Sequence, residues 1–107
     1  MQIFLRNRTG SIDATAEYDH DSGSVIVKKG SLVAKELSNA PTFRNRNAFL
    51  RRREGVVNDG KMTKDLEFGS LSTSATFVMG SNRDGWRTWR DANGKTMADL
   101  FGKSNDN

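Results

Sequence analysis

The sequence predicts an α+β fold, in which a small antiparallel sheet packs against two to three short helices. Short alternating or β-branched segments, separated by turn residues, fill the first quarter of the chain, a pattern typical of antiparallel hairpins. In later segments, residues that favour helix N-termini are followed by apolar residues at helical spacing. The length of 107 residues suits one domain with its own core. We therefore expect a single α+β domain at residues 1–103 and a disordered tail at 104–107.

Strands are expected at residues 2–6, 12–18 and 24–27, with a further short one within 62–68. The second segment alternates apolar and polar residues, which predicts a strand with one buried face. Residues 19–23 form a turn-rich stretch that predicts a hairpin, and Gly23 can supply the positive φ that such a loop uses. The buried face of the second strand would comprise Ile12, Ala14, Ala16 and Tyr18.

The middle of the chain predicts a helical turn at 32–37, then a helix from Phe43 to about Arg53 with Thr42 as its N-cap. At about 3.6 residues per turn, one face of this helix is apolar and several arginines point away from it. Arg46 and Arg53 flank the apolar face, and we expect their charged ends to extend to solvent. The apolar face would contain Phe43, Phe49 and Leu50, and the opposite face Arg44, Arg51 and Arg52.

The last third of the chain predicts two further helices and one strand. Ser70 is a good N-cap for a helix that Gly80 can end. Residues 86–90 predict a strand that carries both tryptophans. Thr96 and Asp99 resemble a capping pair at the start of a short final helix. The buried positions would be Leu71, Ala75, Val78 and Met79 in the first of these helices, and Met97, Leu100 and Phe101 in the final one.

Composition excludes several classes of protein. No cysteine is present, so disulfide bonds, thiolate zinc sites and cysteine nucleophiles are excluded. No apolar run approaches the roughly 20 residues that span a bilayer. The first residues also lack the charged head and long apolar stretch of a signal peptide. We therefore expect a cytoplasmic protein without a membrane partner.

The sequence contains no recognisable catalytic constellation, and we expect a protein that is not an enzyme and holds neither a cofactor nor a metal. His20, the only histidine, lies in a turn between two aspartates, where an exposed side chain is expected instead of a metal ligand. Gly94-Lys95-Thr96 lacks the upstream glycine of a phosphate-binding loop and predicts a turn before a helix cap. A small metal-dependent nuclease is an alternative that the loose spacing of the acids disfavours. Its residues would be Asp59, Asp65 and Glu67 with Lys61 and Lys64.

The charge distribution favours a polyanionic partner. The chain has 17 Lys and Arg against 13 Asp and Glu, a formal net charge of +4, and between residues 22 and 53 only Glu36 is acidic. On a strand, Trp86 and Trp89 would face opposite sides. We expect Trp86 in the core and Trp89 as an exposed platform for an unstacked base, the alternative being that both are buried. The candidate nucleic-acid-binding residues are Arg44, Arg51, Arg52, Arg83, Arg87, Arg90, Lys95 and Trp89.

The chain carries F-G-S-L-S-T-S-A at 68–75, G-S-N-R-D-G-W at 80–86, a second tryptophan at 89, and G-K-T-M at 94–97. Together these motifs resemble a bacterial domain of unknown function, number 4357, over nearly the whole chain. Leu71 stands where the family pattern has proline, and Asp84 where it has asparagine. Both changes keep the cap and turn chemistry, so the fold expectation is unaffected.

The resemblance implies an accessory role. Such domains occur at the C-terminus of GIY-YIG-type nucleases and near restriction–modification proteins, and they are similar to the RAMA domain, for which recognition of DNA or modified DNA has been proposed. The chain does not carry the GIY-YIG chemistry itself. We therefore expect a non-catalytic nucleic-acid-binding accessory domain, with DNA as its ligand. The alternative is a protein-interaction adaptor that docks on a nuclease or methylase partner.

Overall fold

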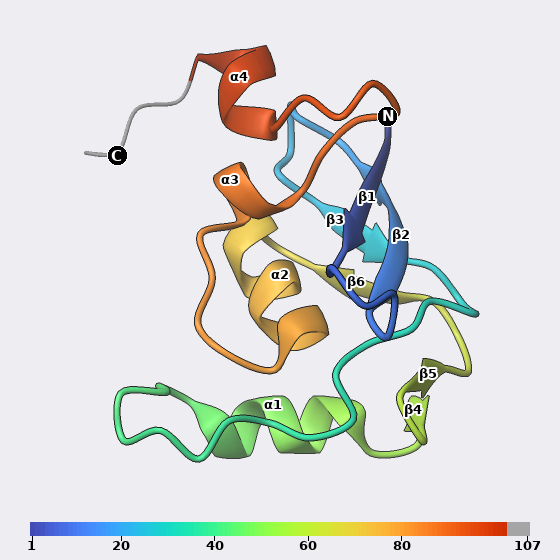
Figure 1. Ribbon diagram of the computed structural model, residues 1–107, viewed down its shortest axis with the longest axis vertical. Coiled ribbons are helices and arrows are strands. Elements are labelled where there is room, and N and C mark those ends of the chain that lie inside the picture. Colours follow the sequence, from blue (N-terminus) through green and yellow to red (C-terminus); the bar gives the residue numbers. More distant parts are fainter. Residues whose placement is uncertain (103–107) are drawn as a thin grey trace.

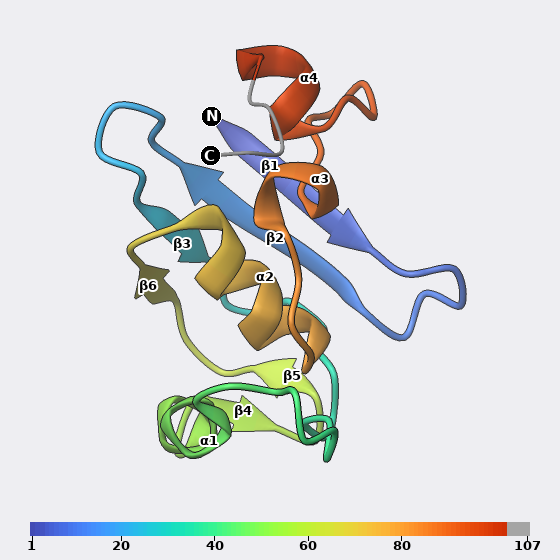
Figure 2. The same cartoon turned by 90° about the vertical axis from the view of Figure 1, so that its left-hand side faces the viewer.

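The computed structural model describes residues 1–102 and shows a sheet with helices packed against one of its faces (Figures 1 and 2). The main sheet is antiparallel, with strand order β1-β2-β3-β6. Its strands are β1 (Gln2–Arg6), β2 (Asp13–Tyr18), β3 (Val25–Val27) and β6 (Leu66–Phe68), and a separate hairpin contains β4 (Val57–Asn58) and β5 (Lys61–Met62). The helices are α1 (Arg46–Arg53), α2 (Leu71–Met79), α3 (Gly85–Thr88) and α4 (Met97–Phe101). The α+β fold class is confirmed, whereas the tail expected at 104–107 lies outside the described residues.

The N-terminal strands follow from their alternating apolar residues. β1 and β2 pair with Leu5 opposite Ala14, and the predicted inner face of β2 is buried. Gly23 adopts a φ of 81° in the hairpin loop, as expected. β6 then pairs with β3, with Val25 opposite Phe68, and forms one edge of the sheet. Strand pairing therefore joins the first quarter of the chain to residues that lie far along the sequence.

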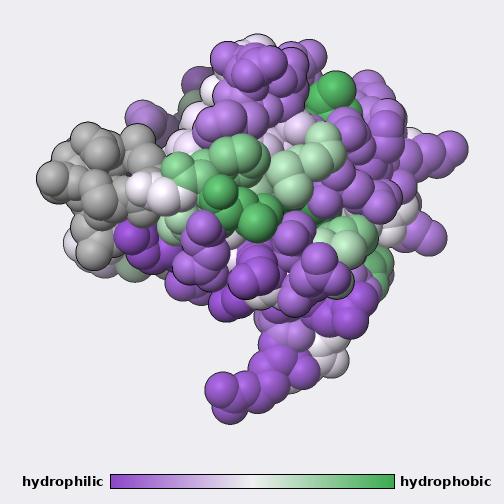
Figure 3. Space-filling model, turned by 90° about the horizontal axis from the view of Figure 1, so that it is seen from above, coloured by the Kyte–Doolittle hydropathy of each residue, from purple (hydrophilic) through white to green (hydrophobic). Residues whose placement is uncertain are grey.

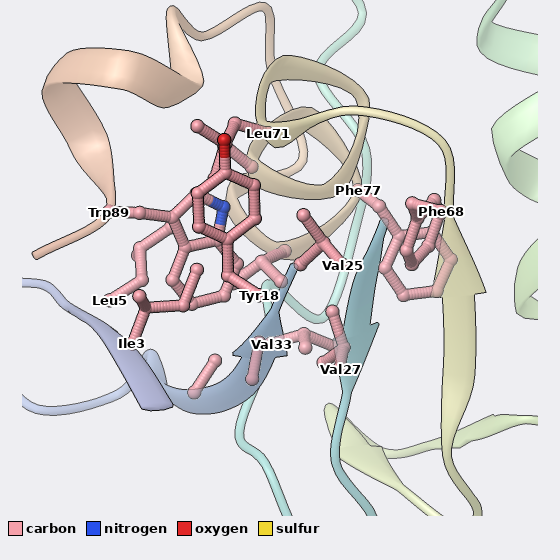
Figure 4. Close-up of a cluster of buried hydrophobic side chains, with 14 of the residues drawn as sticks. Ile3, Leu5, Tyr18, Val25, Val27, Val33, Phe68, Leu71, Phe77 and Trp89 are labelled. Atoms are coloured by element: carbon pink, nitrogen blue, oxygen red, sulfur yellow. The ribbon is translucent and has the colours of Figure 1, made fainter. Parts of the chain in front are cut away.

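α2 provides the main helical contribution to the core. The hydroxyl of Ser70 accepts a 3.1 Å hydrogen bond from the Thr73 amide, and Gly80 ends the helix with a φ of 74°, so both predicted caps are confirmed. The rings of Phe68 and Phe77 are 4.9 Å apart where β6 and α2 meet. Figure 4 shows the cluster that results between the sheet and the helices. Its fully buried members include Ile3, Ala16, Val25, Val27, Phe77, Val78 and Trp89.

Residues 32–37 are not helical, contrary to the prediction. Leu32 exchanges two backbone hydrogen bonds of 2.9 Å with Asp13, and the Val33 amide donates to the Gly60 carbonyl at 2.7 Å. This segment therefore ties the main sheet to the β4–β5 hairpin. The helical preference of the local sequence is overridden because distant strands occupy its backbone donors.

α1 begins at Arg46, later than the predicted start at Phe43. Asn45 takes the N-cap position with a left-handed φ of 60°, and its side chain makes no capping hydrogen bond. Thr42 is therefore not the cap, and Phe43 is buried in the turn that precedes the helix. The left-handed residue interrupts the helical path that the spacing of the apolar residues predicts.

The apolar face of α1 is narrower than predicted. Phe49 is half-buried and its ring lies 5.8 Å from that of Phe43, but Leu50 is 37% exposed. The placement of Phe49 is confirmed and that of Leu50 is wrong. α1 is therefore not held by a continuous apolar stripe, and its arginines contribute to holding it in place.

Residues 86–90 do not form a strand. Gly85–Thr88 form the short helix α3, and the Asp84 carboxylate caps it by accepting a 3.0 Å hydrogen bond from the Trp86 amide. The chain becomes extended at Trp89, and Arg90 then pairs with β1. Asp84 is a strong N-cap residue, and its side chain starts a helix where the aromatic residues favour a strand.

Gly85 lets α3 approach α2 closely. A Cβ atom at this position would collide with the backbone of Leu71 and Ser72. The Gly85 amide donates a 2.9 Å hydrogen bond to the hydroxyl of Ser72, which fixes the approach. Glycine is therefore required here because a side chain would not fit, and not because the backbone dihedral angles need it.

α4 starts as predicted and ends differently. The Thr96 hydroxyl accepts from the Asp99 amide at 3.1 Å, and the Asp99 carboxylate accepts from the Thr96 amide, which confirms the capping pair. Met97 is fully buried, but Leu100 and Phe101 are each 38% exposed and not inside. Met97 anchors this helix of five residues in the core, while Phe101 at its end stacks on the exposed ring of His20.

The outer face of the main sheet carries no helix in the part of the chain that the structure describes (Figures 1 and 2). Phe4, Thr15 and Ile26 are half-buried there, while their sequence neighbours fill the core on the inner face. None of the helices within residues 1–102 is long and apolar enough to cross a lipid bilayer.

Candidate nucleic-acid interface

The last turn of α1 and the turn before the helix form an arginine surface, which we define as Arg44, Arg51 and Arg52. All three side chains are exposed, as predicted, although Arg44 precedes the helix and helical phase accounts only for Arg51 and Arg52. Among the described residues, no carboxylate lies within 4.0 Å of their guanidinium groups. Arg51, Arg52 and Arg53 also lie in the last turn of α1, where cations stabilise the helix dipole. The surface therefore keeps its positive charge uncompensated by ion pairs.

Arg52 is the most constrained member of the arginine surface. Its guanidinium carbon lies 4.6 Å from the centre of the Phe68 ring, and its Nη2 donates a 2.7 Å hydrogen bond to the Glu67 carbonyl. The side chain thus lies along β6, an edge strand of the sheet. Arg44 and Arg51 form no such bond within residues 1–102, so both are available to a ligand.

The two other arginines of α1 are structural. Arg46 donates through Nε to the Ser38 carbonyl at 3.0 Å. Arg53 is only 8% exposed, and its two terminal nitrogens donate to the carbonyls of Ala34 at 2.6 Å and Phe77 at 2.7 Å. Burial lowers the pKa of Arg53. The expectation that Arg53 extends to solvent is therefore wrong, because the surrounding backbone carbonyls bind its charge inside the fold.

A groove of about 450 Å³ runs along α1 beside the first turn of α2. The half-buried ring of Phe49 and the exposed Arg51 and Arg52 line it. Asn45, Ala48 and Thr73 complete the lining, so no carboxylate faces it. The groove therefore offers an anion both a concave apolar surface and two guanidinium groups.

Arg83 lies near the start of α1. The Asn82 side chain donates a 2.9 Å hydrogen bond to the Thr42 carbonyl, and the Arg83 amide donates to the Thr76 hydroxyl at 3.2 Å. These bonds hold the loop after α2 against the segment that precedes Arg44. Arg83 is exposed, and the loop therefore extends the arginine surface to a second segment of the chain.

The remaining predicted basic residues lie in α3 and the turn after it. Arg87 pairs with Asp84 at 2.8 Å, and Arg90 donates to the Gly94 carbonyl at 2.7 Å. Lys95 is exposed in the turn before α4. Figure 1 places α3 and this turn away from α1, toward the opposite end of the molecule. The predicted set therefore divides into two groups that do not form one surface.

A family model described as domain of unknown function (DUF4357) matches residues 4–101. The chain belongs to this family. No curated protein and no solved structure matches the chain. The family match runs from β1 to the end of α4 and thus includes both groups of basic residues.

The tryptophans of this family member are placed opposite to the prediction. Trp89 is fully buried, and its indole Nε1 donates a 3.0 Å hydrogen bond to the Ser74 hydroxyl. Figure 4 shows its ring in the cluster that also contains Leu5 and Leu71. Trp89 therefore cannot serve as a platform for a base. Trp86 is half-buried, 6.2 Å from the His20 ring, and not the core residue that the strand interpretation predicts.

The carboxylates considered for a nuclease are used in local structure. Asp65 accepts hydrogen bonds from the Lys29 amide at 2.7 Å and the Lys28 ammonium at 3.0 Å, and these contacts hold its pKa below the usual range. Glu67 accepts from the Ser24 hydroxyl at 2.7 Å. Within residues 1–102, no three His, Asp or Glu side chains are grouped to hold a metal ion. Asp65 and Glu67 thus both hold hydrogen-bond partners from neighbouring segments.

An acidic hollow of about 410 Å³ is lined by Met1 and residues 17–21. Figure 1 places the end of β2 and the loop after it at the end of the molecule opposite α1. We define the acidic hollow by Glu17, Asp19 and Asp21, with Met1, Tyr18 and His20. The exposed His20 ring stacks on Phe101 at 3.8 Å, and its Nδ1 lies 3.0 Å from the Tyr18 hydroxyl. Burial, followed by the charge of Asp19, raises the pKa of Tyr18. The arginine surface and this group of acidic side chains therefore lie on different parts of the molecule.

Proposed function

We propose that this chain is a non-catalytic nucleic-acid-binding accessory domain, with DNA as its ligand, that works beside a nuclease or a restriction–modification enzyme. The arginine surface carries this proposal, because its charges have no carboxylate partner among residues 1–102. The resemblance to domains that accompany GIY-YIG-type nucleases, and to the RAMA domain, supports DNA over other polyanions.

Phosphate contacts suit the arrangement of these arginines. A guanidinium group can donate two parallel hydrogen bonds to one phosphate and keeps its charge at any physiological pH. Arg51 and Arg52 line the groove from α1, while Arg44 precedes the helix and Arg83 comes from a separate loop. Contacts from several segments would position a nucleic-acid backbone along α1 without reading its sequence.

A salt titration tests the proposal. We expect the domain to bind a fluorescent 20-base-pair DNA duplex at low salt, with log K falling linearly against log salt concentration because counterions are released from the phosphates. A slope near −0.9 for each contacted phosphate is expected. If no DNA or RNA, single- or double-stranded, binds at low salt, the proposal is wrong.

A protein-interaction adaptor is the second candidate, and a different end of the molecule favours it. Figure 3 shows apolar residues gathered on the face that carries α4. Met1 is 43% exposed there, and Leu100 and Phe101 are 38% exposed, next to the acidic hollow. A nuclease or methylase partner would dock here through a basic segment with an apolar anchor. The double change Leu100→Ser and Phe101→Ser should then abolish co-purification with that partner and leave DNA binding unchanged.

A further inference from the structure

The outer face of the main sheet presents Phe4 beside Arg90. The two residues exchange backbone hydrogen bonds, from the Phe4 amide at 2.7 Å and from the Arg90 amide at 2.9 Å. Residues that pair in this way in antiparallel strands project their side chains to the same face. Because Ile3 and Leu5 fill the core, Phe4 and Arg90 lie together on the face that no helix of residues 1–102 covers.

A second arginine flanks Phe4 on the same face. Arg6 is two residues along β1 from Phe4, so its side chain also projects outward. A hollow of about 380 Å³ lies between them and the turn before α4. Its lining comprises Phe4, Arg6, Thr88, Arg90, Asp91, Ala92 and Gly94. The hollow therefore combines a half-buried aromatic ring with two guanidinium groups.

Both arginines can carry an anionic ligand. Arg90 is held by the neutral Gly94 carbonyl at 2.7 Å, so its position is fixed while its charge is uncompensated. Arg6 lies 3.4 Å from Asp13, but its side chain is 69% exposed, and an exposed pair of this kind is weak. Asp91, the one carboxylate of the lining, accepts hydrogen bonds from the amides of Asn93 and Lys95 and is committed to its turn.

We propose that this hollow binds one unstacked base of single-stranded nucleic acid, with the base on the Phe4 ring and the adjoining phosphates on Arg6 and Arg90. The inference rests on the proposed function. It adds a second surface, the hollow at Phe4, which selects single-stranded over double-stranded nucleic acid. In a duplex, base faces are covered by their neighbours, whereas a single strand can place a base on an aromatic side chain. Phe4 thus takes the role that sequence analysis expected of Trp89.

The experiment compares fluorescent (dT)20 with a 20-base-pair duplex in anisotropy titrations at the same low salt. The variant Phe4→Leu keeps an apolar side chain and removes the aromatic face. Ile26→Ala, on the same outer face two strands away, is the matched control. We expect Phe4→Leu to weaken (dT)20 binding about tenfold, the order of one stacked base, and to leave duplex binding unchanged. Arg90→Gln should weaken (dT)20 binding severalfold and reduce its salt slope by about 0.7.

The outcomes separate this inference from the proposed function. If Phe4→Leu binds (dT)20 as tightly as wild type while Arg44→Ala with Arg51→Ala weakens both ligands, the inference is wrong and the proposed function stands. If wild type binds neither ligand, the proposed function fails. Thymidine monophosphate is the last ligand to be compared. If it binds the hollow as tightly as (dT)20 does, the ligand is a free nucleotide and not a strand. That result would also overturn the inference.

Discussion

The guanidinium group of Arg53 donates a 2.7 Å hydrogen bond to the backbone carbonyl of Phe77 and lies 5.1 Å from the centre of the Phe77 ring. A second terminal nitrogen donates to the carbonyl of Ala34. One side chain of α1 therefore joins α2 and the extended segment at 32–37. Among the described residues, its Nε is the buried side-chain polar atom without a hydrogen-bond partner.

We expect Arg53→Met to lower the free energy of unfolding by about 2 kcal/mol. Methionine takes the place of the apolar stem of arginine but cannot make the charged hydrogen bonds to the two backbone carbonyls. Urea unfolding at neutral pH measures this change. Arg51→Met removes the same charge from an exposed position of the same helix and should alter stability by less than about 0.5 kcal/mol. Equal effects of the two substitutions would contradict the anchoring role of Arg53.

The buried bond between Trp89 and Ser74 should show coupling. Ser74→Ala leaves the indole N–H without its acceptor and should cost about 1–3 kcal/mol. Trp89→Phe removes the donor and part of the packed volume, which also destabilises the fold. Because the second substitution removes the group that the first leaves unpaired, the double variant should be more stable than the sum predicts. Strict additivity in thermal or urea unfolding would show that the bond contributes nothing.

Gly85→Ala should destabilise the domain by about 3 kcal/mol, since the added methyl group meets the backbone of α2 and cannot be accommodated by side-chain rotation. Gly69→Ala is the matched control. A Cβ atom at Gly69 has no atom within 4 Å and its φ is not in the left-handed region, so this substitution should be nearly neutral. The midpoint of thermal unfolding separates the two variants, and a neutral Gly85→Ala would show that α3 does not pack as described.

Removing two charges of the arginine surface should weaken DNA binding and leave stability unchanged. We expect Arg44→Ala with Arg51→Ala to lower duplex affinity similarly across sequences and to reduce the salt slope by about 0.9 for each lost phosphate contact. The control is Arg8→Ala with Lys29→Ala, which removes the same charge from exposed positions away from α1. If both pairs weaken binding equally, net charge and not the arginine surface determines affinity.

The Asp65 carboxylate should stabilise the fold at neutral pH and lose this effect in acid. Its pKa is held below the ordinary value first by the Lys29 amide and then by Lys28. A carboxyl whose pKa is lower in the folded chain stabilises above its unfolded pKa, about 4, and loses this effect as pH falls through the folded value. Asp65→Asn should therefore be less stable than wild type at pH 7, and the difference should shrink as pH falls below the unfolded pKa of about 4 and through the folded one. Urea unfolding of both proteins across this pH range measures the difference, and a gap that stays constant would contradict the stabilising role of the Asp65 carboxylate.

The alternating segments and the caps of α2 and α4 could be predicted because each depends on neighbours in sequence. Ser70, Gly80 and the pair Thr96 and Asp99 act within one helical turn, and the structure places them as expected. Leu100 could not be placed, because its exposure depends on where a short helix meets the edge of the core.

The errors at Leu32 and Arg53 have a common physical origin in contacts between distant segments. Leu32 is extended because Asp13 takes its backbone hydrogen bonds, and Arg53 is buried because Ala34 and Phe77 bring carbonyls to it. The predicted placement of the two tryptophans is wrong for a local reason, because it assumes the two-residue period of a strand for residues 86–90. Asp84, a good N-cap directly before Gly85 and Trp86, was the signal that could have indicated a helix.

From the separation of the arginine surface and the acidic hollow we expect the domain to have an electric dipole moment in addition to its net charge of +4. In the field of a polyanion, such a molecule experiences a torque before it makes any contact, and it turns so that α1 leads. Encounters would then begin at α1, and the hollow at Phe4 and Arg90 would take up a base only after this first contact. The orienting distance is set by the Debye length, about 10 Å at 0.1 M salt, so added salt should slow association in addition to weakening the bound state.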